Sequence, residues 1–320
     1  MTKPNFFIIG APKCGTTALC EYLKEHPNIY ISEPKEPHYF ATDFPKYRLT
    51  ATKEEYFNLF AESEEHLAIG EGSVFYLFSS VALKNIYEYD PDAKIIIMLR
   101  NPVDLVYSFH SQQLYSSDEA EKSFEKAWHL QDLRREGKHI PRLCRHPIFL
   151  DYAAIGRLGE QVERALSIFP REQIEIIWFE DFVRSTKEVY DRVLDFLAVP
   201  RDDRTNFVRI NENKVHKLGL LGNFSEKPPA LLSDLALKAR DFLGIERLNI
   251  LDTIRTINTK VASREPLSER LRAEISSEFA SDIHKLSELL NKDLNHWLSP
   301  QTANSTSNQN DRSYTAPGQK

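Results

Sequence analysis

The chain alternates short apolar runs with amphipathic stretches. Three runs rich in apolar and β-branched residues are typical of buried strands, at residues 5–9, 94–99 and 174–179. A stretch with helical periodicity follows each run, at residues 17–25, 108–114 and 187–197. Strands that alternate with helices indicate an α/β protein whose parallel sheet carries its sites at the carboxyl ends of the strands. We therefore expect a single domain with a parallel sheet flanked by helices.

The rest of the chain divides into three parts. Residues 116–169 have a mostly helical pattern and are predicted to form a lid or side lobe, and residues 267–298 a long amphipathic helix with a break near Ser281. From residue 299 onward almost no apolar residue remains to offset the entropy of ordering. The sequence predicts one domain over residues 1–298 and a disordered polar tail over 299–320.

Composition narrows the class of protein. Of the 320 residues, 41% are hydrophobic and 28% are charged, which suits one large core. No apolar stretch approaches the roughly 20 residues of a membrane span. The net charge of -6 does not favour nucleic acid as a partner. The first residues lack the pattern of a signal peptide, and the odd set Cys14, Cys20 and Cys144 indicates neither a disulfide framework nor a metal site. We expect a cytoplasmic location.

A glycine-bearing loop follows the first predicted strand and comprises Gly10, Ala11, Pro12, Lys13, Cys14, Gly15, Thr16 and Thr17. The two glycines have the spacing of a P-loop, but Thr16 stands where a nucleoside triphosphatase carries lysine. Glycine allows close backbone approach, and the N–H groups that open the next helix attract phosphate. We interpret the segment as a variant phosphate loop, hence a P-loop-like sheet; the alternative is a glycine turn capped by threonine.

The second predicted strand ends in Arg100, where a triphosphatase has an aspartate that holds Mg²⁺. An arginine binds an anion directly. Ser108 follows about two helical turns later, so Arg100 and Ser108 can bracket one phosphate. The alternative is a surface ion pair between Arg100 and Asp104. No metal site is predicted.

These motifs resemble those of the sulfotransferases that use 3′-phosphoadenosine-5′-phosphosulfate (PAPS), in the form of the glycan (heparan sulfate-like) branch and its bacterial relatives. Residues 12–17 resemble the 5′-phosphosulfate loop, and residues 99–108 resemble the 3′-phosphate motif. The resemblance implies binding of PAPS and its product adenosine 3′,5′-bisphosphate, without a metal, by Pro12, Lys13, Cys14, Gly15, Thr16, Thr17, Arg100 and Ser108. Residues 217–222 faintly resemble a second 3′-phosphate loop, which adds Lys217, or they form a surface loop.

Sulfuryl transfer places new negative charge on the leaving phosphate, and we assign Lys13 as the cation that stabilises it. A proline-rich segment offers a carboxylate and an imidazole, Glu36 and His38, which point to the same side of an extended chain. The resembling segment of glycan sulfotransferases supplies the catalytic base. We assign Glu36 as the base and His38 as its partner. Alternatively, His38 is the base, or Glu36 pairs with Lys35 while His38 is a packed histidine.

One position departs from the family. Several glycan-modifying members carry an active-site lysine where this chain has Gly72. Contacts of Ser73 and Tyr76 with donor or acceptor, or substitution by Lys35, remain open. His110 is the next candidate for the base.

The acceptor is less well defined. Residues 134–146 hold five Lys or Arg and one acid, a run that can receive an anionic acceptor but is more often a solvated helix face. The sequence predicts a sulfotransferase acting on a hydroxyl or amine of a glycan, lipid or small metabolite. The alternatives are a P-loop kinase or triphosphatase, which Thr16 and Arg100 oppose, and an inactive nucleotide-binding protein. The oligomeric state is not predicted.

Overall fold

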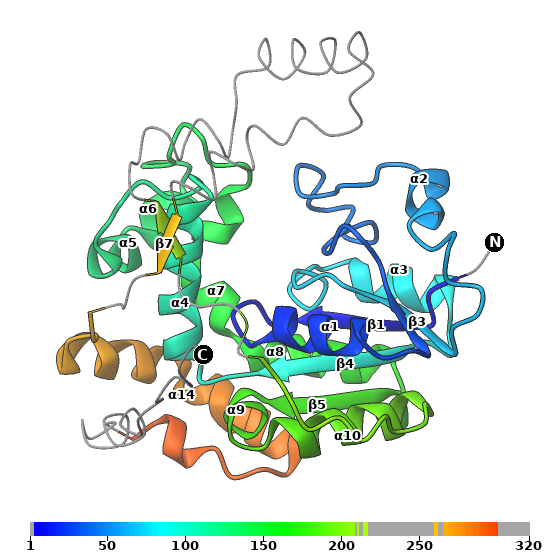
Figure 1. Ribbon diagram of the computed structural model, residues 1–320. Coiled ribbons are helices and arrows are strands. Elements are labelled where there is room, and N and C mark those ends of the chain that lie inside the picture. The colour runs from blue at the N-terminus through cyan, green and yellow to red at the C-terminus, as the bar shows by residue number, and fades with distance from the viewer. Residues whose placement is uncertain (1–2, 209, 211–213, 217–258, 262–264, 300–320) are drawn as a thin grey trace, which may run out of the picture.

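A five-stranded sheet forms the centre of the protein (Figure 1). The computed structural model describes residues 3–208, 210, 214–216, 259–261 and 265–299. The strands of the sheet, in chain order, are β1 (Phe6–Gly10), β2 (Ile29–Ile31), β3 (Ala68–Gly72), β4 (Lys94–Leu99) and β5 (Ile174–Trp178). Their spatial order is β2-β3-β1-β4-β5, and every pairing is parallel. The predicted P-loop-like α/β sheet is confirmed.

The central strands show why the apolar runs were recognisable. Strand β1 is buried along its whole length, and β4 is buried from its second residue onward, because both faces of a parallel sheet are covered. Strand β3 has no such run, since it contains two glycines and a glutamate. Gly70 is required there, because a Cβ would lie 2.5 Å from the Phe6 carbonyl oxygen. Strand β3 was therefore not predicted, and neither was β2, which is only three residues long.

Helices cover both faces of the sheet. The larger ones are α1 (Thr16–Lys24), α3 (Ala82–Tyr89), α4 (Pro102–Tyr115), α8 (Leu158–Ile168), α10 (Thr186–Leu197) and α14 (Glu269–Leu290). The crossover from β1 to β2 and the crossover from β3 to β4 run in opposite directions across the sheet, so right-handed connections place α1 and α3 on opposite faces. Helix α8 contacts both α3 and α14.

The predicted side lobe is built from short helices. They are α5 (Phe124–His129), α6 (Gln131–Arg135), η1 (Pro147–Leu150) and α7 (Tyr152–Gly156), beside α4 (Figure 1). Helix α8, which falls in the same predicted region, instead packs on α14. The remaining elements are α2 (Lys53–Asn58), η2 (Arg171–Gln173), α9 (Phe179–Arg184), β6 (Lys214–His216), β7 (Thr259–Val261) and η3 (Asn295–Trp297).

The predicted break in the last long helix is wrong. Helix α14 runs without interruption through Ser281 and ends at Asn291, which adopts φ 45°. The Asp282 carboxylate accepts hydrogen bonds from the backbone N–H groups of Gly159 and Glu160, at 2.7 and 2.9 Å. This polar residue therefore joins two helices, and it does not end one.

The C-terminal part of the domain closes on the end of β4. The Asn101 amide donates to the Trp297 carbonyl oxygen at 3.2 Å. None of the described helices has both the length and the apolarity that a bilayer crossing requires. The predicted tail beyond residue 299 lies outside the described residues.

Candidate active site

The loops at the carboxyl ends of the strands converge on one edge of the sheet, because parallel strands all end on the same side. The loop after β1 carries Lys13, the loop after β2 carries Glu36, and β4 leads into Arg100. Strand β3 ends at Gly72, immediately before Ser73. The tertiary fold thus gathers the predicted residues from segments far apart in the sequence.

The phosphate loop turns sharply before α1. Gly15 adopts φ 90° as the N-cap of α1, and a Cβ there would lie 3.3 Å from the Phe182 ring, so both conformation and space favour glycine. Lys13 also has a left-handed backbone, with φ 64°. The first turn of α1, with Thr16 and Thr17, presents backbone N–H groups that the helix cannot pair internally. This arrangement suits an anion.

Cys14 is a packing residue of this loop. It is fully buried, and its thiol donates to the Pro12 carbonyl oxygen at 3.5 Å. Burial raises the pKa of the Cys14 thiol to about 12. The side chain is therefore neutral at physiological pH and is not a nucleophile.

Arg100 joins the phosphate loop. Its Nη1 donates to the Lys13 carbonyl oxygen at 3.4 Å, and its guanidinium lies 4.5 Å from the centre of the Phe179 ring. The alternative pair with Asp104 is not found, since the Asp104 carboxylate binds Arg272 at 2.8 Å. Ser108 is buried on α4. Whether Arg100 and Ser108 share one phosphate stays a prediction.

The turn between Arg100 and α4 is fixed by local capping. The Asn101 side chain accepts a hydrogen bond from the backbone N–H of Val103 at 3.0 Å, and Pro102 occupies the first helical position. The arginine is thereby held at the junction of a buried strand and a capped helix.

Glu36 lies between two nitrogen groups of its own loop. Its Oε1 is 2.7 Å from Lys35 Nζ, and its Oε2 is 3.4 Å from His38 Nε2. The contact between Glu36 and His38 was expected, but not through an extended chain, because both residues adopt left-handed backbone with φ 64° and 50°. The three residues assigned to catalysis, Lys13, Glu36 and His38, all have this uncommon conformation. Such strain is frequent at functional sites.

The Glu36 carboxylate and the His38 imidazole differ in solvent exposure. The Glu36 side chain is 32% exposed, whereas that of His38 is 4% exposed. The imidazole stacks on Phe75 with ring centres 5.1 Å apart, and its buried Nδ1 has no hydrogen-bond partner among the described residues. Burial alone would raise the pKa of Glu36, but the ion pair with Lys35 and the contact with His38 hold it well below its usual range.

The buried carboxylate of Glu71 is connected through hydroxyl groups to the loop that carries Glu36. Glu71 of β3 is fully buried and accepts hydrogen bonds from the hydroxyls of Ser73, Tyr56 and Tyr76, at 2.5, 2.8 and 2.9 Å. Two of these hydroxyls also accept hydrogen bonds from the backbone of residues 32–40, the segment that carries the predicted base and is called the base loop below. Ser73 accepts from the N–H of His38 at 3.0 Å, and Tyr76 accepts from the N–H of Phe40 at 3.2 Å. Burial raises the pKa of Glu71 despite the three donors. Ser73 and Tyr76 therefore position the base loop.

The room beside Gly72 is already filled. A Cβ at this position would lie 2.6 Å from Cys20 Sγ and 3.4 Å from Lys35 Cε. The Cys20 thiol thus occupies space that a side chain at residue 72 would take, and the stem of Lys35 lies in van der Waals contact with the same position.

A sulfotransferase domain family matches residues 3–218, about two thirds of the chain. The chain belongs to the sulfotransferase family. Carbohydrate sulfotransferase 15 of Mus musculus is 28% identical over 243 residues, which cover 61% of this chain and 43% of that protein. The bifunctional heparan sulfate N-deacetylase/N-sulfotransferase 3 of the same species is 28% identical over 209 residues, 61% of this chain and 22% of that one. The chain spans less than half the length of these relatives.

One solved structure shows the same architecture over nearly the whole chain. A sulfotransferase from Alicyclobacillus acidocaldarius superposes with a TM-score of 0.67 and 30% sequence identity, covering 93% of this chain and 99% of that one. The described part of this chain therefore has the same fold as the sulfotransferase from Alicyclobacillus acidocaldarius.

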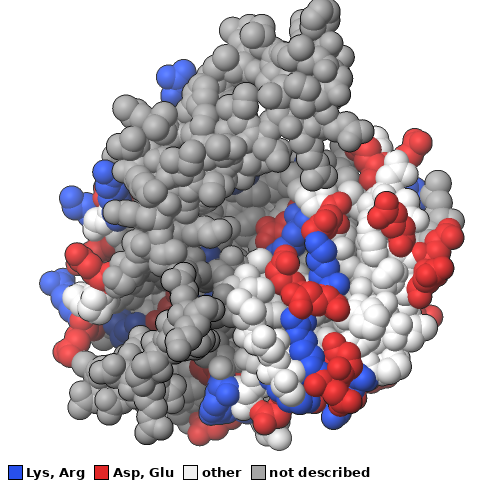
Figure 2. All heavy atoms as spheres, in the orientation of Figure 1, with Lys and Arg blue, Asp and Glu red and all other residues white. Residues whose placement is uncertain are grey.

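Most of the basic side chains of residues 134–146, in the side lobe, form ion pairs with acids of the chain. Four of the five cations in this run are paired: Arg134 with Glu119, Arg135 with Asp132 and Asp151, Lys138 with Glu136, and Arg145 with Asp118. On the described part of the face shown in Figure 2, acidic and basic side chains are likewise interspersed. The run therefore gives no support for a site for an anionic acceptor.

The reserve candidate for the base, His110, lies apart from the strand ends. His110 is buried in α4 with Nε2 2.8 Å from the Glu121 carbonyl oxygen, so it does not face the phosphate loop as a reserve base would. Among the described residues no cluster of His, Cys, Asp or Glu could hold a metal ion. Lys217 lies outside the described residues.

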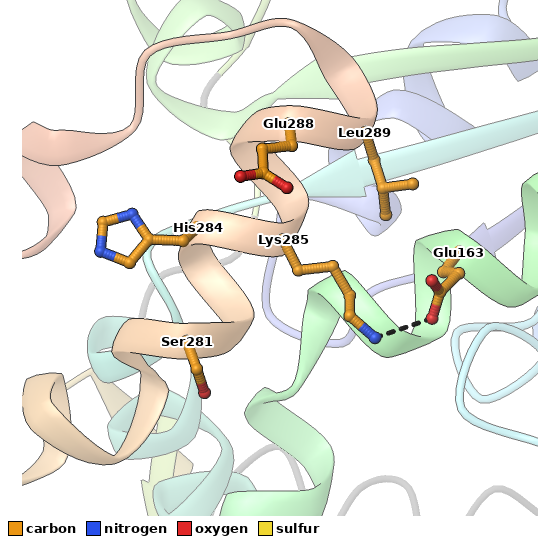
Figure 3. A pocket seen from close by; sticks show the side chains of 6 residues that line it. All are labelled: Glu163, Ser281, His284, Lys285, Glu288 and Leu289. Carbon is orange, nitrogen blue, oxygen red and sulfur yellow. Dashed lines mark hydrogen bonds and ion pairs between the residues drawn. The ribbon is translucent and has the colours of Figure 1, made fainter.

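An open hollow between α8 and α14 belongs to the scaffold (Figure 3). It is lined by Glu163, Ser281, His284, Lys285, Glu288 and Leu289, and Lys285 pairs with Glu163 at 2.8 Å across it. No strand-end loop contributes to this hollow.

Sequence reasoning missed the role of Glu71. An acid between two glycines, flanked by Ala68 and Ile69, is unusual enough to mark a buried polar site. Two of its hydroxyl partners, Ser73 and Tyr76, follow it closely in the sequence, but the third, Tyr56, comes from α2, and the sequence pattern does not relate α2 to β3.

Proposed function

We propose that this protein is a sulfotransferase that moves the sulfuryl group of PAPS to a hydroxyl or amine acceptor. The observation that carries the proposal is the contact of Arg100 with the Lys13 backbone, which places a cation, not a Mg²⁺-holding aspartate, beside the phosphate loop. The loop and α1 would hold the 5′-phosphosulfate, and Arg100 with Ser108 the 3′-phosphate. Thr16 and Arg100 disfavour a P-loop kinase or triphosphatase.

In the proposed reaction the acceptor oxygen or nitrogen bonds to sulfur while the bond from sulfur to the phosphate oxygen breaks. Adenosine 3′,5′-bisphosphate leaves, and Lys13 stabilises the charge that develops on its bridging oxygen. The acceptor proton goes to the Glu36 carboxylate. Glu36 is favoured over His38 because its side chain is partly exposed, whereas the imidazole is buried against Phe75.

A glycan hydroxyl is the first acceptor to test, because the mouse relative is named a carbohydrate sulfotransferase. Lipid and small-metabolite hydroxyls follow. Cytoplasmic location and independence of metal ions are part of the same proposal.

The decisive experiment offers candidate acceptors with PAPS labelled in the sulfuryl group and follows label in the product. Transfer to at least one acceptor is expected. Calorimetry supplies a second arm, in which adenosine 3′,5′-bisphosphate binds and ATP with Mg²⁺ does not. The reverse preference would indicate a kinase or triphosphatase, and binding without any transfer would indicate an inactive nucleotide-binding protein.

A further inference from the structure

We infer that Lys35 is a positioning residue for the base, holding the Glu36 carboxylate from a slot that Gly72 leaves open beside Cys20. This role rests on the proposed function, because it has meaning only if Glu36 accepts the acceptor proton. Lys35 is not proposed to touch the sulfuryl group.

The slot is formed by the absence of a side chain on β3. A Cβ at Gly72 would lie 2.6 Å from Cys20 Sγ and 3.4 Å from Lys35 Cε, so a side chain there would have to displace the thiol and would pack directly against the lysine stem. Cys20 is buried on α1 and closes the slot from the other side. The Lys35 side chain is 19% exposed, and its Nζ lies 2.7 Å from Glu36 Oε1.

The ion pair gives the carboxylate a fixed direction. Lys35 binds Oε1 and His38 approaches Oε2, so both oxygens of Glu36 are constrained while the side chain stays 32% exposed. A charge-assisted bond of this length is stronger than a neutral one. Positioning of this kind matters because a displacement of about 1 Å can cost about 10²-fold in rate.

The titratable groups around Glu36 come from three elements. Lys35 and His38 interact with Glu36 from its own loop and Cys20 from α1, while Glu21 of α1 interacts with Lys35 and Glu71 of β3 interacts with His38 and Cys20. Burial raises the pKa of Cys20 to about 11, which leaves the thiol neutral. Glu21 and Glu71 can only add negative charge. Lys35 is therefore the fixed positive charge that keeps a shielded carboxylate ionised.

A second lysine near the same segment provides a matched control. Lys24 of α1 pairs with Glu33, but those side chains are 41% and 68% exposed. An exposed pair contributes little and is screened by salt. Lys24→Met therefore removes the same side chain from an ion pair without disturbing the Glu36 carboxylate.

The test compares Lys35→Met, Lys35→Arg and Lys24→Met by the pH dependence of kcat and by ¹³C NMR titration of the Glu36 carboxyl, assigned by its loss in Glu36→Gln. In Lys35→Met the acid limb and the titration should move upward by about one to three pH units. kcat at neutral pH should fall by about 10²-fold, with the Kd for adenosine 3′,5′-bisphosphate unchanged. Lys35→Arg should keep the titration low, and Lys24→Met should match the wild type.

An unmoved Glu36 titration in folded Lys35→Met overturns the inference. Thermal melting establishes folding, and Lys35→Gln, which keeps a polar head, replaces the methionine variant if that one unfolds. Absence of sulfuryl transfer by the wild type would defeat the proposed function and with it the catalytic role of Lys35, while the NMR titration would still show whether Lys35 holds the Glu36 carboxylate. Transfer by the wild type with an unmoved titration would defeat only the role of Lys35.

Discussion

Three residues with left-handed backbone, Lys13, Glu36 and His38, define the candidate site at the residue scale. Each such conformation costs on the order of 1–3 kcal/mol in a residue other than glycine. The conformations of Glu36 and His38 persist because Ser73 holds the backbone of the loop and Lys35 holds the carboxylate. The strained backbone turns the Glu36 carboxylate toward solvent while the imidazole remains buried.

Lys13→Ala should lower kcat far more than it weakens binding of adenosine 3′,5′-bisphosphate. The lysine is proposed to act on charge that develops only as the bond to the leaving phosphate breaks. Loss of one such group typically costs about 10²–10³-fold in kcat. Steady-state kinetics with calorimetry of the product separates the two effects, and an unchanged kcat would remove Lys13 from the mechanism.

Glu36→Gln should preserve donor binding and slow transfer by about 10²–10⁴-fold, because it keeps the size of the side chain but removes its basicity. Since Lys35 and His38 lower the pKa of Glu36, the acid limb of kcat in the wild type should lie below the ordinary range of glutamate. A pH profile measures this limb, which should be absent from the residual activity of the variant. Near-native kcat in Glu36→Gln, with loss of activity in His38→Ala, would make the imidazole the base.

The same carboxylate should affect stability. Because the pKa of Glu36 is lower in the folded protein than in the unfolded chain, its ionised form stabilises the fold above the unfolded value of about 4.3. This contribution is lost as pH falls through the lower, folded value. Denaturant unfolding should therefore show the difference between wild type and Glu36→Gln shrinking as the solution is acidified below about pH 4.

At the scale of elements, β3 supports two neighbours at once. Its Glu71 binds three hydroxyls, and two of these, on Ser73 and Tyr76, carry the connection to the backbone of the base loop. The third, on Tyr56, donates to Glu71 at 2.8 Å, and among the described residues no hydrogen bond joins it to the backbone of that loop. The two tyrosines therefore differ in what they position.

Tyr76→Phe should lower kcat more than Tyr56→Phe does. Both variants keep the ring and remove one hydrogen bond to Glu71, but only Tyr76→Phe leaves the buried N–H of Phe40 without its acceptor. An unpaired buried donor costs about 1–3 kcal/mol. Kinetics and thermal unfolding of both variants measure the difference, and product binding should stay the same. Equal kcat in the two variants would show that the hydrogen bond from Phe40 to Tyr76 does not position the base, and that Tyr76 contributes only to packing.

The unit of β4 and α4 places Arg100 beside the phosphate loop, so Arg100→Ala should weaken donor binding with a smaller effect on kcat. The 3′-phosphate is remote from the bond that breaks, and its contact is the same in ground state and transition state. Calorimetry with adenosine bisphosphates that have or lack the 3′-phosphate tests the assignment. Equal affinity of the wild type for both would contradict it.

At the scale of the whole molecule, the parallel sheet brings together loops that are nearly a hundred residues apart. The chain crosses between β1, β2, β3 and β4 in both directions, yet all these strands end on one edge. The C-terminal segment then returns to this edge through the bond from Asn101 to the Trp297 carbonyl oxygen. The site is thus a product of topology more than of any single segment.

Activity should survive treatment with EDTA. The charge that a kinase neutralises with Mg²⁺ is assigned here to Lys13, Arg100 and the start of α1. The measurement is sulfuryl transfer before and after chelation, with Mg²⁺ added back as the control. Loss of activity that Mg²⁺ restores would reassign the chemistry.

The sequence by itself determined the apolar strands β1, β4 and β5, and it singled out the glycine-bearing loop, Arg100, Glu36 and His38, whose roles stay predictions. These depend on local information: a strand covered on both faces must be apolar along its length, and a loop that approaches phosphate needs glycine at given spacings. Residue type therefore follows directly from local environment at these positions.

Only the tertiary structure decided what surrounds the base. Strand β3 carries glycines because Phe6 and Cys20 leave no room for a Cβ at Gly70 and Gly72. These contacts join segments that no sequence periodicity relates. The helix break expected near Ser281 failed for the same reason, since Asp282 binds the backbone of α8. The choice of Glu36 over His38 depends on burial against Phe75. Burial and long-range contact depend on how distant segments pack, which a local pattern does not contain.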